Sequence, residues 1–163
     1  MNPQDQIIRV TKIKEGQTPL YPETFFLDDL INEMCQYAKA ELKKIDRTNV
    51  DVEVFKYSRF EKCLLHADRV KLRQVFINLL DNSVKYTDRG CIFFGFHTSV
   101  SNNINFFVED TGLGICNEND LELSIAQGLV QQLGGSMEVR PSEDAGTAVN
   151  FNIACTPCEL SNN

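Results

Sequence analysis

Amide side chains recur at helical spacing between residues 68 and 87, and their oxygens could hold a hard cation such as Mg²⁺. Apolar residues in this segment follow the helical period, so a helix is expected there with Asp68 as its N-cap. Four polar residues share one stripe of that helix: Gln74, Asn78, Asn82 and Lys85. A solvated face remains the alternative, because Lys71 and Asp81 share the stripe. Asparagine is a poor helix former, however, and an unusual choice for such a face.

A second candidate site follows the strand-like run over residues 105–110. Asp110 places a carboxylate at the end of that strand, where it could accept a hydrogen bond from an exocyclic amine. Gly112 and Gly114 would let the backbone approach a ligand closely or adopt a positive φ. A single Asp-x-Gly-x-Gly is usually a turn. Its order here, after an Asn-x-x-x-Asn helix and a hairpin, makes a ligand site the stronger interpretation.

Three segments resemble consecutive parts of the ATP-binding catalytic domain of sensor histidine kinases. Residues 72–87 resemble the N-box, residues 110–115 the first glycine box, and residues 123–139 the helix and strand that follow the nucleotide lid. With Gly146 and Thr147, the resemblance covers residues 24–155. The same fold serves gyrase-type topoisomerases, mismatch-repair ATPases and heat-shock chaperones, and the Asn-Ser-Val-Lys-Tyr-Thr run favours the histidine kinases.

The resemblance implies a site for ATP and Mg²⁺. Asn78 would hold the Mg²⁺ that bridges the phosphates, and Asn82 and Lys85 would contact phosphate oxygens. Gln74 stands where hydrolytic relatives place a glutamate that activates water, so no catalytic residue is assigned. A neutral amide there is consistent with phosphoryl transfer to a histidine, a reaction that needs positioning and charge neutralisation.

The same resemblance assigns the adenine side of the site. Tyr86 would lie against the adenine ring, and Asp110 would read its amino group. Gly112 and Gly114 would admit the base and the ribose. Gly146 and Thr147, near the end of the match, are the remaining candidate nucleotide-binding residues.

The chain departs from this family between residues 115 and 123, where the long nucleotide lid is almost entirely missing. Asp120 and Glu122 occupy the places of lid glycines, and their carboxylates would repel a polyphosphate. Asn119 and Glu122 have the spacing of a capping box, which would satisfy the helix N–H groups internally. Later, Asp144 and Val149 stand in the places of a glycine and a phenylalanine. The γ-phosphate side of the site is therefore expected to be damaged.

The expected function is transfer of the γ-phosphoryl group of Mg-ATP to a histidine on a separate dimerisation domain, in a two-component system with a response regulator. Weak activity is expected because of the short lid, which could be natural or engineered. The alternative is a pseudokinase or protein-interaction module on the same fold. Another ATPase of this fold is disfavoured by the glutamine at position 74.

Composition limits the partners and the location. The 163 residues carry a net charge of −7, which argues against nucleic acid or an anionic membrane surface as a partner. No apolar run is long enough to span a membrane, and no signal peptide is visible. A cytoplasmic domain, or the cytoplasmic part of a membrane-anchored kinase, is expected.

Helices alternating with hairpin-linked strands predict an α/β (α+β) fold, a two-layer sandwich. Its mixed, mostly antiparallel sheet should carry about three helices on one face and be wet on the other, since Asn150 and Asn152 alternate with apolar residues. Residues 1–23 are interpreted as a tail or linker from a missing dimerisation domain, residues 24–158 as the ATP-binding domain, and residues 159–163 as a C-terminal tail.

Two histidines and one cysteine pair are further candidates for chemistry. His66 and His97 fall in predicted strands, and no phosphoacceptor is expected because no His-Glu motif on a helical hairpin is visible. Cys155 and Cys158 form a single C-x-x-C, for which free thiols are the default and a redox or metal role the alternative.

Overall fold

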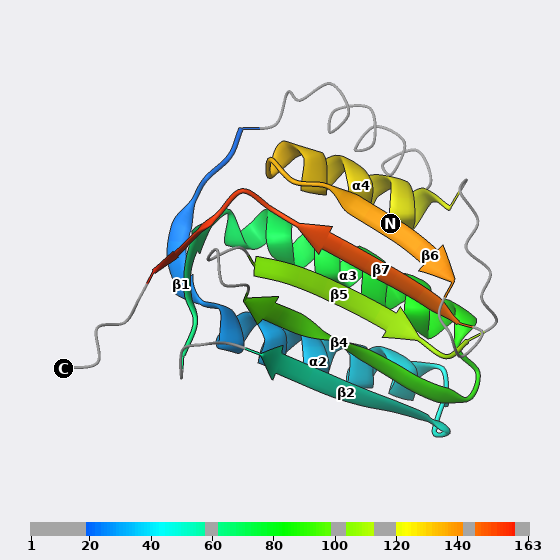
Figure 1. Ribbon diagram of the computed structural model, residues 1–163. Helices are drawn as coiled ribbons and strands as arrows, with labels where there is room; N and C mark the ends of the chain where they lie inside the picture. Colours follow the sequence, from blue (N-terminus) through cyan, green and yellow to red (C-terminus); the bar gives the residue numbers. More distant parts are fainter. Residues whose placement is uncertain (1–18, 58–61, 99–103, 113–119, 142–145, 159–163) are drawn as a thin grey trace.

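The computed structural model describes residues 19–57, 62–98, 104–112, 120–141 and 146–158 (Figure 1). Helices cover one face of a larger sheet, and a small sheet lies at one end. The helices are α2 (Leu27–Lys44), α3 (Arg69–Tyr86) and α4 (Leu121–Gln132). The larger sheet holds β2 (Val50–Tyr57), β4 (Gly90–Thr98), β5 (Ile104–Asp110), β6 (Met137–Pro141) and β7 (Thr147–Asn152), and the small sheet holds β1 (Glu23–Phe26), β3 (Leu64–Ala67) and β8 (Thr156–Cys158).

The larger sheet has the strand order β2-β4-β5-β7-β6. Its β2–β4 pair is parallel, and its other pairs are antiparallel. In Figure 1 the strands lie in front of α2 and α3, which pack on the same side of the sheet. The predicted sandwich, with a mixed and mostly antiparallel sheet, is therefore confirmed.

The small sheet was not predicted as a sheet. His66 was predicted to lie in a strand, and it lies in β3. Strand β3 pairs with β1 on one side and with β8 on the other, both antiparallel. Neither partner is local in the sequence, so hydrophobic periodicity carries no signal for these pairings.

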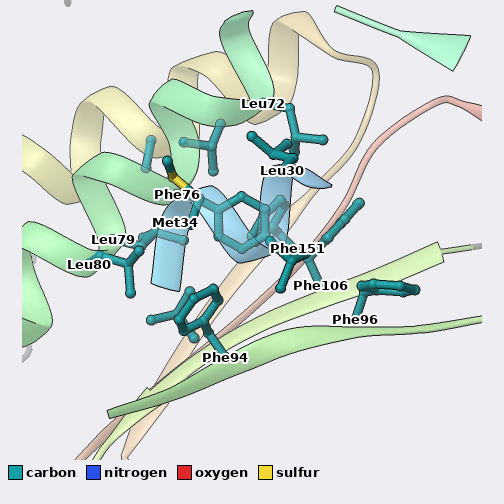
Figure 2. Close-up of a cluster of buried hydrophobic side chains, with 14 of the residues drawn as sticks. Leu30, Met34, Leu72, Phe76, Leu79, Leu80, Phe94, Phe96, Phe106 and Phe151 are labelled. Carbon is teal, nitrogen blue, oxygen red and sulfur yellow. The ribbon is translucent and has the colours of Figure 1, made fainter. Parts of the chain in front are cut away.

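The core lies between α3 and the sheet and is centred on Phe76 (Figure 2). The Phe76 ring contacts three strand residues, with centroid distances of 6.0 Å to Phe94, 5.7 Å to Phe106 and 5.4 Å to Phe151. Each of these strand residues belongs to the alternating set that points toward the helices. The apolar stripe of α3 thereby fixes the rotation of the helix, and so determines which of its polar residues face the ends of the strands.

The first turn of α3 is tied to the chain that enters β1. Asp68 is the N-cap, as predicted, and its Oδ1 accepts a hydrogen bond from the Lys71 backbone N–H at 3.0 Å. Its other oxygen accepts from the Tyr21 backbone N–H at 2.9 Å. Lys71 Nζ in turn donates to the Pro19 carbonyl oxygen at 2.8 Å. These bonds join residues 19–21 to the helix that carries the candidate site.

The helices of the described residues are too short or too polar to cross a lipid bilayer.

Candidate functional site

Helix α3 buries two of the four residues of its polar stripe. Asn78 is 6% exposed and Asn82 is 3% exposed, so a solvated face is the wrong interpretation for these two residues. Asn78 Oδ1 accepts a hydrogen bond from Gln74 Nε2 at 2.8 Å. Two buried amide atoms, Asn78 Nδ2 and Asn82 Oδ1, have no hydrogen-bond partner among the described residues. A buried amide atom without a partner is costly, and a ligand or ion is one way to satisfy it.

Asp110 ends β5 and is held by three donors, one of which is the neighbour of Asn82 on α3. Its Oδ2 accepts from Ser83 Oγ at 3.0 Å, and its Oδ1 accepts from the backbone N–H groups of Gly112 at 3.0 Å and Thr147 at 3.3 Å. Burial raises the pKa of this carboxyl, and the three hydrogen bonds oppose that rise. A carboxylate has about four lone-pair positions, so it keeps room for one more donor, such as an exocyclic amine.

Ser83 is a site residue that the sequence did not reveal. It is buried on α3 next to Asn82, and its hydroxyl orients the Asp110 carboxylate. Only its position beside an asparagine of the stripe could have marked it, because a serine has many roles in a helix.

Two glycines are required by close backbone packing at this site. A Cβ at Gly112 would lie 2.4 Å from the Tyr86 carbonyl oxygen, and a Cβ at Gly146 would lie 1.7 Å from the Asp110 carbonyl oxygen. Gly146 thereby lets β7 begin close enough for Thr147 N–H to reach the Asp110 carboxylate. Gly114 lies outside the described residues.

We expect Gly146→Ala to lower stability by about 1–3 kcal/mol, because the added methyl group must push the start of β7 away from β5. Urea unfolding followed by circular dichroism measures this loss. The same displacement should weaken the Thr147–Asp110 hydrogen bond and hence nucleotide affinity. An unchanged unfolding midpoint would contradict the packing role of Gly146.

The N-terminus of α4 is capped by a carboxylate, although by a different residue from the one predicted. The cap is Asp120, not Asn119, because the helix begins at Leu121. Asp120 Oδ1 accepts from the backbone N–H groups of Glu122 at 2.9 Å and Leu123 at 3.4 Å. The N–H groups that could bind a phosphate are thus already bonded to an internal anion.

Tyr86 and Lys85 join α3 to this cap. Tyr86 OH donates to Asp120 Oδ2 at 3.2 Å, and Lys85 Nζ lies 5.1 Å from the centre of the Tyr86 ring. The Tyr86 hydroxyl, followed by the carboxylates of Glu122 and Asp120, raises the pKa of Lys85, which therefore carries its charge at neutral pH. The end of α3 and the start of α4 thus bring together the ammonium group of Lys85 and the carboxylates of Asp120 and Glu122.

Burial, and then the charge of Asp120, raises the pKa of Glu122. A carboxyl group whose pKa is raised by folding stabilises the folded state at pH values below its ordinary pKa. This contribution to stability is lost as the pH rises through the raised pKa of the folded state. We therefore expect Glu122→Gln to melt at a higher temperature than the parent chain at neutral pH, with the difference vanishing near about pH 4.5. Thermal unfolding across this pH range measures it. Glu138→Gln, on the exposed side of β6, is the control for removing one surface charge, and an equal gain there would contradict the role of burial.

Among the described side chains, the two histidines and Cys155 make no hydrogen bond to the residues of this site. His66 lies on β3, and its Nδ1 is 2.9 Å from Thr24 Oγ1 on β1. His97 is exposed on β4. The Cys155 thiol is partly buried, and burial raises its pKa to about 11, which disfavours the reactive thiolate. The side chain of Cys158 lies outside the described residues.

Comparisons with known proteins point to one family. The family model described as "Histidine kinase-, DNA gyrase B-, and HSP90-like ATPase" matches residues 67–157. Hybrid signal transduction histidine kinase B of Dictyostelium discoideum is 26% identical, with 80% of this chain and 9% of that protein covered. The autoinducer 2 sensor kinase/phosphatase LuxQ of Vibrio vulnificus is 30% identical, with 96% of this chain and 18% of that protein covered. This chain thus spans less than a fifth of the length of either relative.

A solved structure shares the fold. Full-length ShkA in complex with AMPPNP superposes with a TM-score of 0.77 at 17% identity, covering 94% of this chain and 35% of that one. The matched family segment begins just before α3 and ends in β8, so it contains Asn78, Asn82, Asp110 and the α4 cap. The chain belongs to the family of histidine kinase-, DNA gyrase B- and HSP90-like ATPases.

Proposed function

We propose that this chain is the ATP-binding catalytic domain of a two-component sensor histidine kinase. The observation that carries the proposal is the buried Asp110 carboxylate, fixed by three donors, together with two buried asparagines of α3 that each have one amide atom without a partner among the described residues. A carboxylate so held suits the adenine amino group, and the asparagines suit a metal-bound polyphosphate. The ShkA complex supports a nucleotide of this class, since AMPPNP is an ATP analogue.

The residues present fit a magnesium ion. Asn82 Oδ1 is a buried oxygen without a donor, and amide oxygens are ligands that Mg²⁺ accepts. Asn78 Oδ1 is bonded to Gln74, but a joint rotation of both amides by half a turn would keep a hydrogen bond and turn the Asn78 oxygen toward the site. Bound there, Mg²⁺ would neutralise phosphate charge. Asn78 remains our proposed ligand, and the N–H₂ group of Asn82 and the ammonium group of Lys85 would donate to phosphate oxygens.

The adenine side is proposed to lie along β5 and the end of α3. Asp110 would accept from the amino group, Tyr86 would border the ring, and the close packing at Gly112 would keep the backbone clear of the base. Gly146 and Thr147 would support Asp110 from β7. None of these residues needs to act as an acid or a base, because the acceptor imidazole is itself the nucleophile.

The γ-phosphate would lie close to the Asp120 carboxylate that caps α4, and we therefore expect weak kinase activity. This carboxylate occupies the N–H groups of Glu122 and Leu123, and it adds a negative charge where a triphosphate would extend. The proposed acceptor is a histidine on a separate dimerisation domain, with a response regulator as the next acceptor. The names of the relatives, a hybrid signal transduction histidine kinase and a sensor kinase/phosphatase, support partners of this kind. A cytoplasmic location is proposed with them.

The Asp120 cap also favours a second candidate, a pseudokinase that retains the fold for protein interaction. Calorimetric titration with ATP and with ADP, each with and without Mg²⁺, tests both. Mg²⁺-dependent binding of either nucleotide supports the proposed site. The absence of binding by both nucleotides would overturn it and leave the interaction module.

A further inference from the structure

The larger sheet has a second face that no helix of the described residues covers. Residues alternate along each strand, and the set that includes Phe94 and Phe106 faces the helices. The set that includes Phe93 and Phe107 must face the opposite side, toward the viewer in Figure 1. This side was expected to be exposed to solvent and polar. It is polar along β7, where Asn150 and Asn152 lie on it.

At the β2 end, the same side is aromatic rather than polar. Phe55 lies at the centre of a ring cluster, 5.9 Å from Tyr57, 6.2 Å from Phe93 and 6.3 Å from Phe107 between centroids. These four residues are called the aromatic face. Gly95, which pairs with both Phe55 and Phe107, leaves the space between the rings free of a side chain. The cluster thus spans three strands and reaches the sheet edge formed by β2.

The aromatic face remains open to solvent. Tyr57 is 60% exposed, and the three phenylalanines are only partly buried. Cross-strand aromatic pairs stabilise a sheet, but that role does not require an exposed ring at its edge. Contiguous exposed apolar surface with a polar rim is the usual sign of a protein interaction site.

The rim of the aromatic face is acidic. Asp51 and Glu53 on β2 and Glu109 on β5 point to the same side as the rings, as does Glu138 on β6. Among the residues of these five strands, all of which the structure describes, Arg140 on β6 is the one lysine or arginine of this face. Burial is the main cause that raises the pKa of Cys91, and the charges of Glu53 and Asp51 raise it further.

We propose that the aromatic face docks a partner protein through a basic and apolar segment. Guanidinium and ammonium groups are attracted to ring faces and to carboxylates alike, so a segment that mixes arginine with apolar residues satisfies both parts of the surface. A second copy of this chain fits poorly. A two-fold contact would place the same acidic rim opposite itself, in a chain with a net charge of −7.

This surface is independent of the nucleotide site. Neighbouring residues of β5 point to opposite sides, so Asp110 faces α3 while Glu109 faces away from it. A partner on the aromatic face would therefore leave the nucleotide site accessible. Binding of a partner to the aromatic face therefore does not depend on whether the chain binds ATP.

The test adds the full chain to a short fluorescent peptide of alternating arginine and leucine and follows binding by fluorescence anisotropy. A peptide of equal length with alternating glutamate and leucine is the control. Saturable binding of the basic peptide alone is expected. Tyr57→Ser and Glu53→Lys should each weaken it by at least about fivefold. The matched controls are Tyr21→Ser, a tyrosine 72% exposed before β1, and Glu23→Lys on β1, which changes net charge equally. Both should bind as the parent chain does.

Three results would overturn the proposal. The first is failure of the basic peptide to bind saturably. The second is equal weakening by Glu53→Lys and Glu23→Lys, which would assign the effect to net charge. The third is self-association in analytical ultracentrifugation that Tyr57→Ser abolishes, which would assign this face to a second copy. Tyr57 is exposed, so its variant should fold, and an unchanged melting temperature verifies this.

Discussion

Replacing Asp110 by asparagine should weaken binding of adenine nucleotides by at least about 100-fold while leaving the fold intact. The oxygen of the new amide can still accept from Gly112 and Thr147, and the Ser83 hydroxyl can turn to accept from its N–H₂ group. The stability loss should therefore stay within about 1–2 kcal/mol. The acceptor that would read the adenine amino group is lost, because an N–H₂ now occupies that position.

Isothermal titration with ADP and thermal unfolding of the same samples measure the two effects. Asp29→Asn, on the exposed side of α2, is the matched control and should bind normally. Retained binding by the Asp110 variant would show that the adenine pocket lies elsewhere. A large fall in melting temperature would instead show that the carboxylate serves mainly to hold β5, β7 and α3 together.

Substitutions at Asp120 should change the preference between ATP and ADP. We expect the parent chain to bind ATP no more tightly than ADP, because the Asp120 carboxylate occupies the N–H groups of the first turn of α4. Asp120→Ala frees those groups and removes the charge, and it should raise the affinity for ATP relative to ADP by about tenfold. Loss of the cap should cost about 0.5–2 kcal/mol of stability.

Asp120→Ser separates the two effects, because serine caps a helix without carrying a charge. Its preference for ATP should fall between those of the parent chain and the alanine variant. Asp68→Ser is the matched control: it alters the cap of α3 at the opposite end of that helix and should leave the ratio of the two affinities unchanged. An unaltered ratio in both Asp120 variants would rule out the cap as the obstacle to the γ-phosphate.

The sequence predicted the fold because its strongest patterns are local. The helical period in residues 68–87 and the alternation in β2 and β7 determine which faces are buried, and those faces define the two layers. The small sheet escaped prediction because β1, β3 and β8 are short and far apart in the chain. The aromatic face was not predicted for another reason. Its signal was the doubled phenylalanines at 93–94 and 106–107, which place one ring on each side of the sheet.

The candidate site was predicted in its residue types but not in its bonding. Asn78, Asn82 and Asp110 are buried, and sequence spacing could not tell that Ser83, the neighbour of Asn82, orients Asp110. The position of the α4 cap was wrong by one residue, since Asn119 and Asp120 are both good caps and only backbone geometry selects between them. The identity of the cap matters chemically, because an aspartate adds a full charge where an asparagine would not.

The bonds from Asp68 and Lys71 to residues 19–21 give the incoming chain a mechanical connection to the site. These bonds bypass β1, α2, β2 and β3, and they join the chain before β1 directly to α3. Since α3 is one continuous helix, the residues that make these bonds lie on the same element as Asn78 and Asn82. Residues 19–21 are therefore bonded to the helix that carries the buried amides.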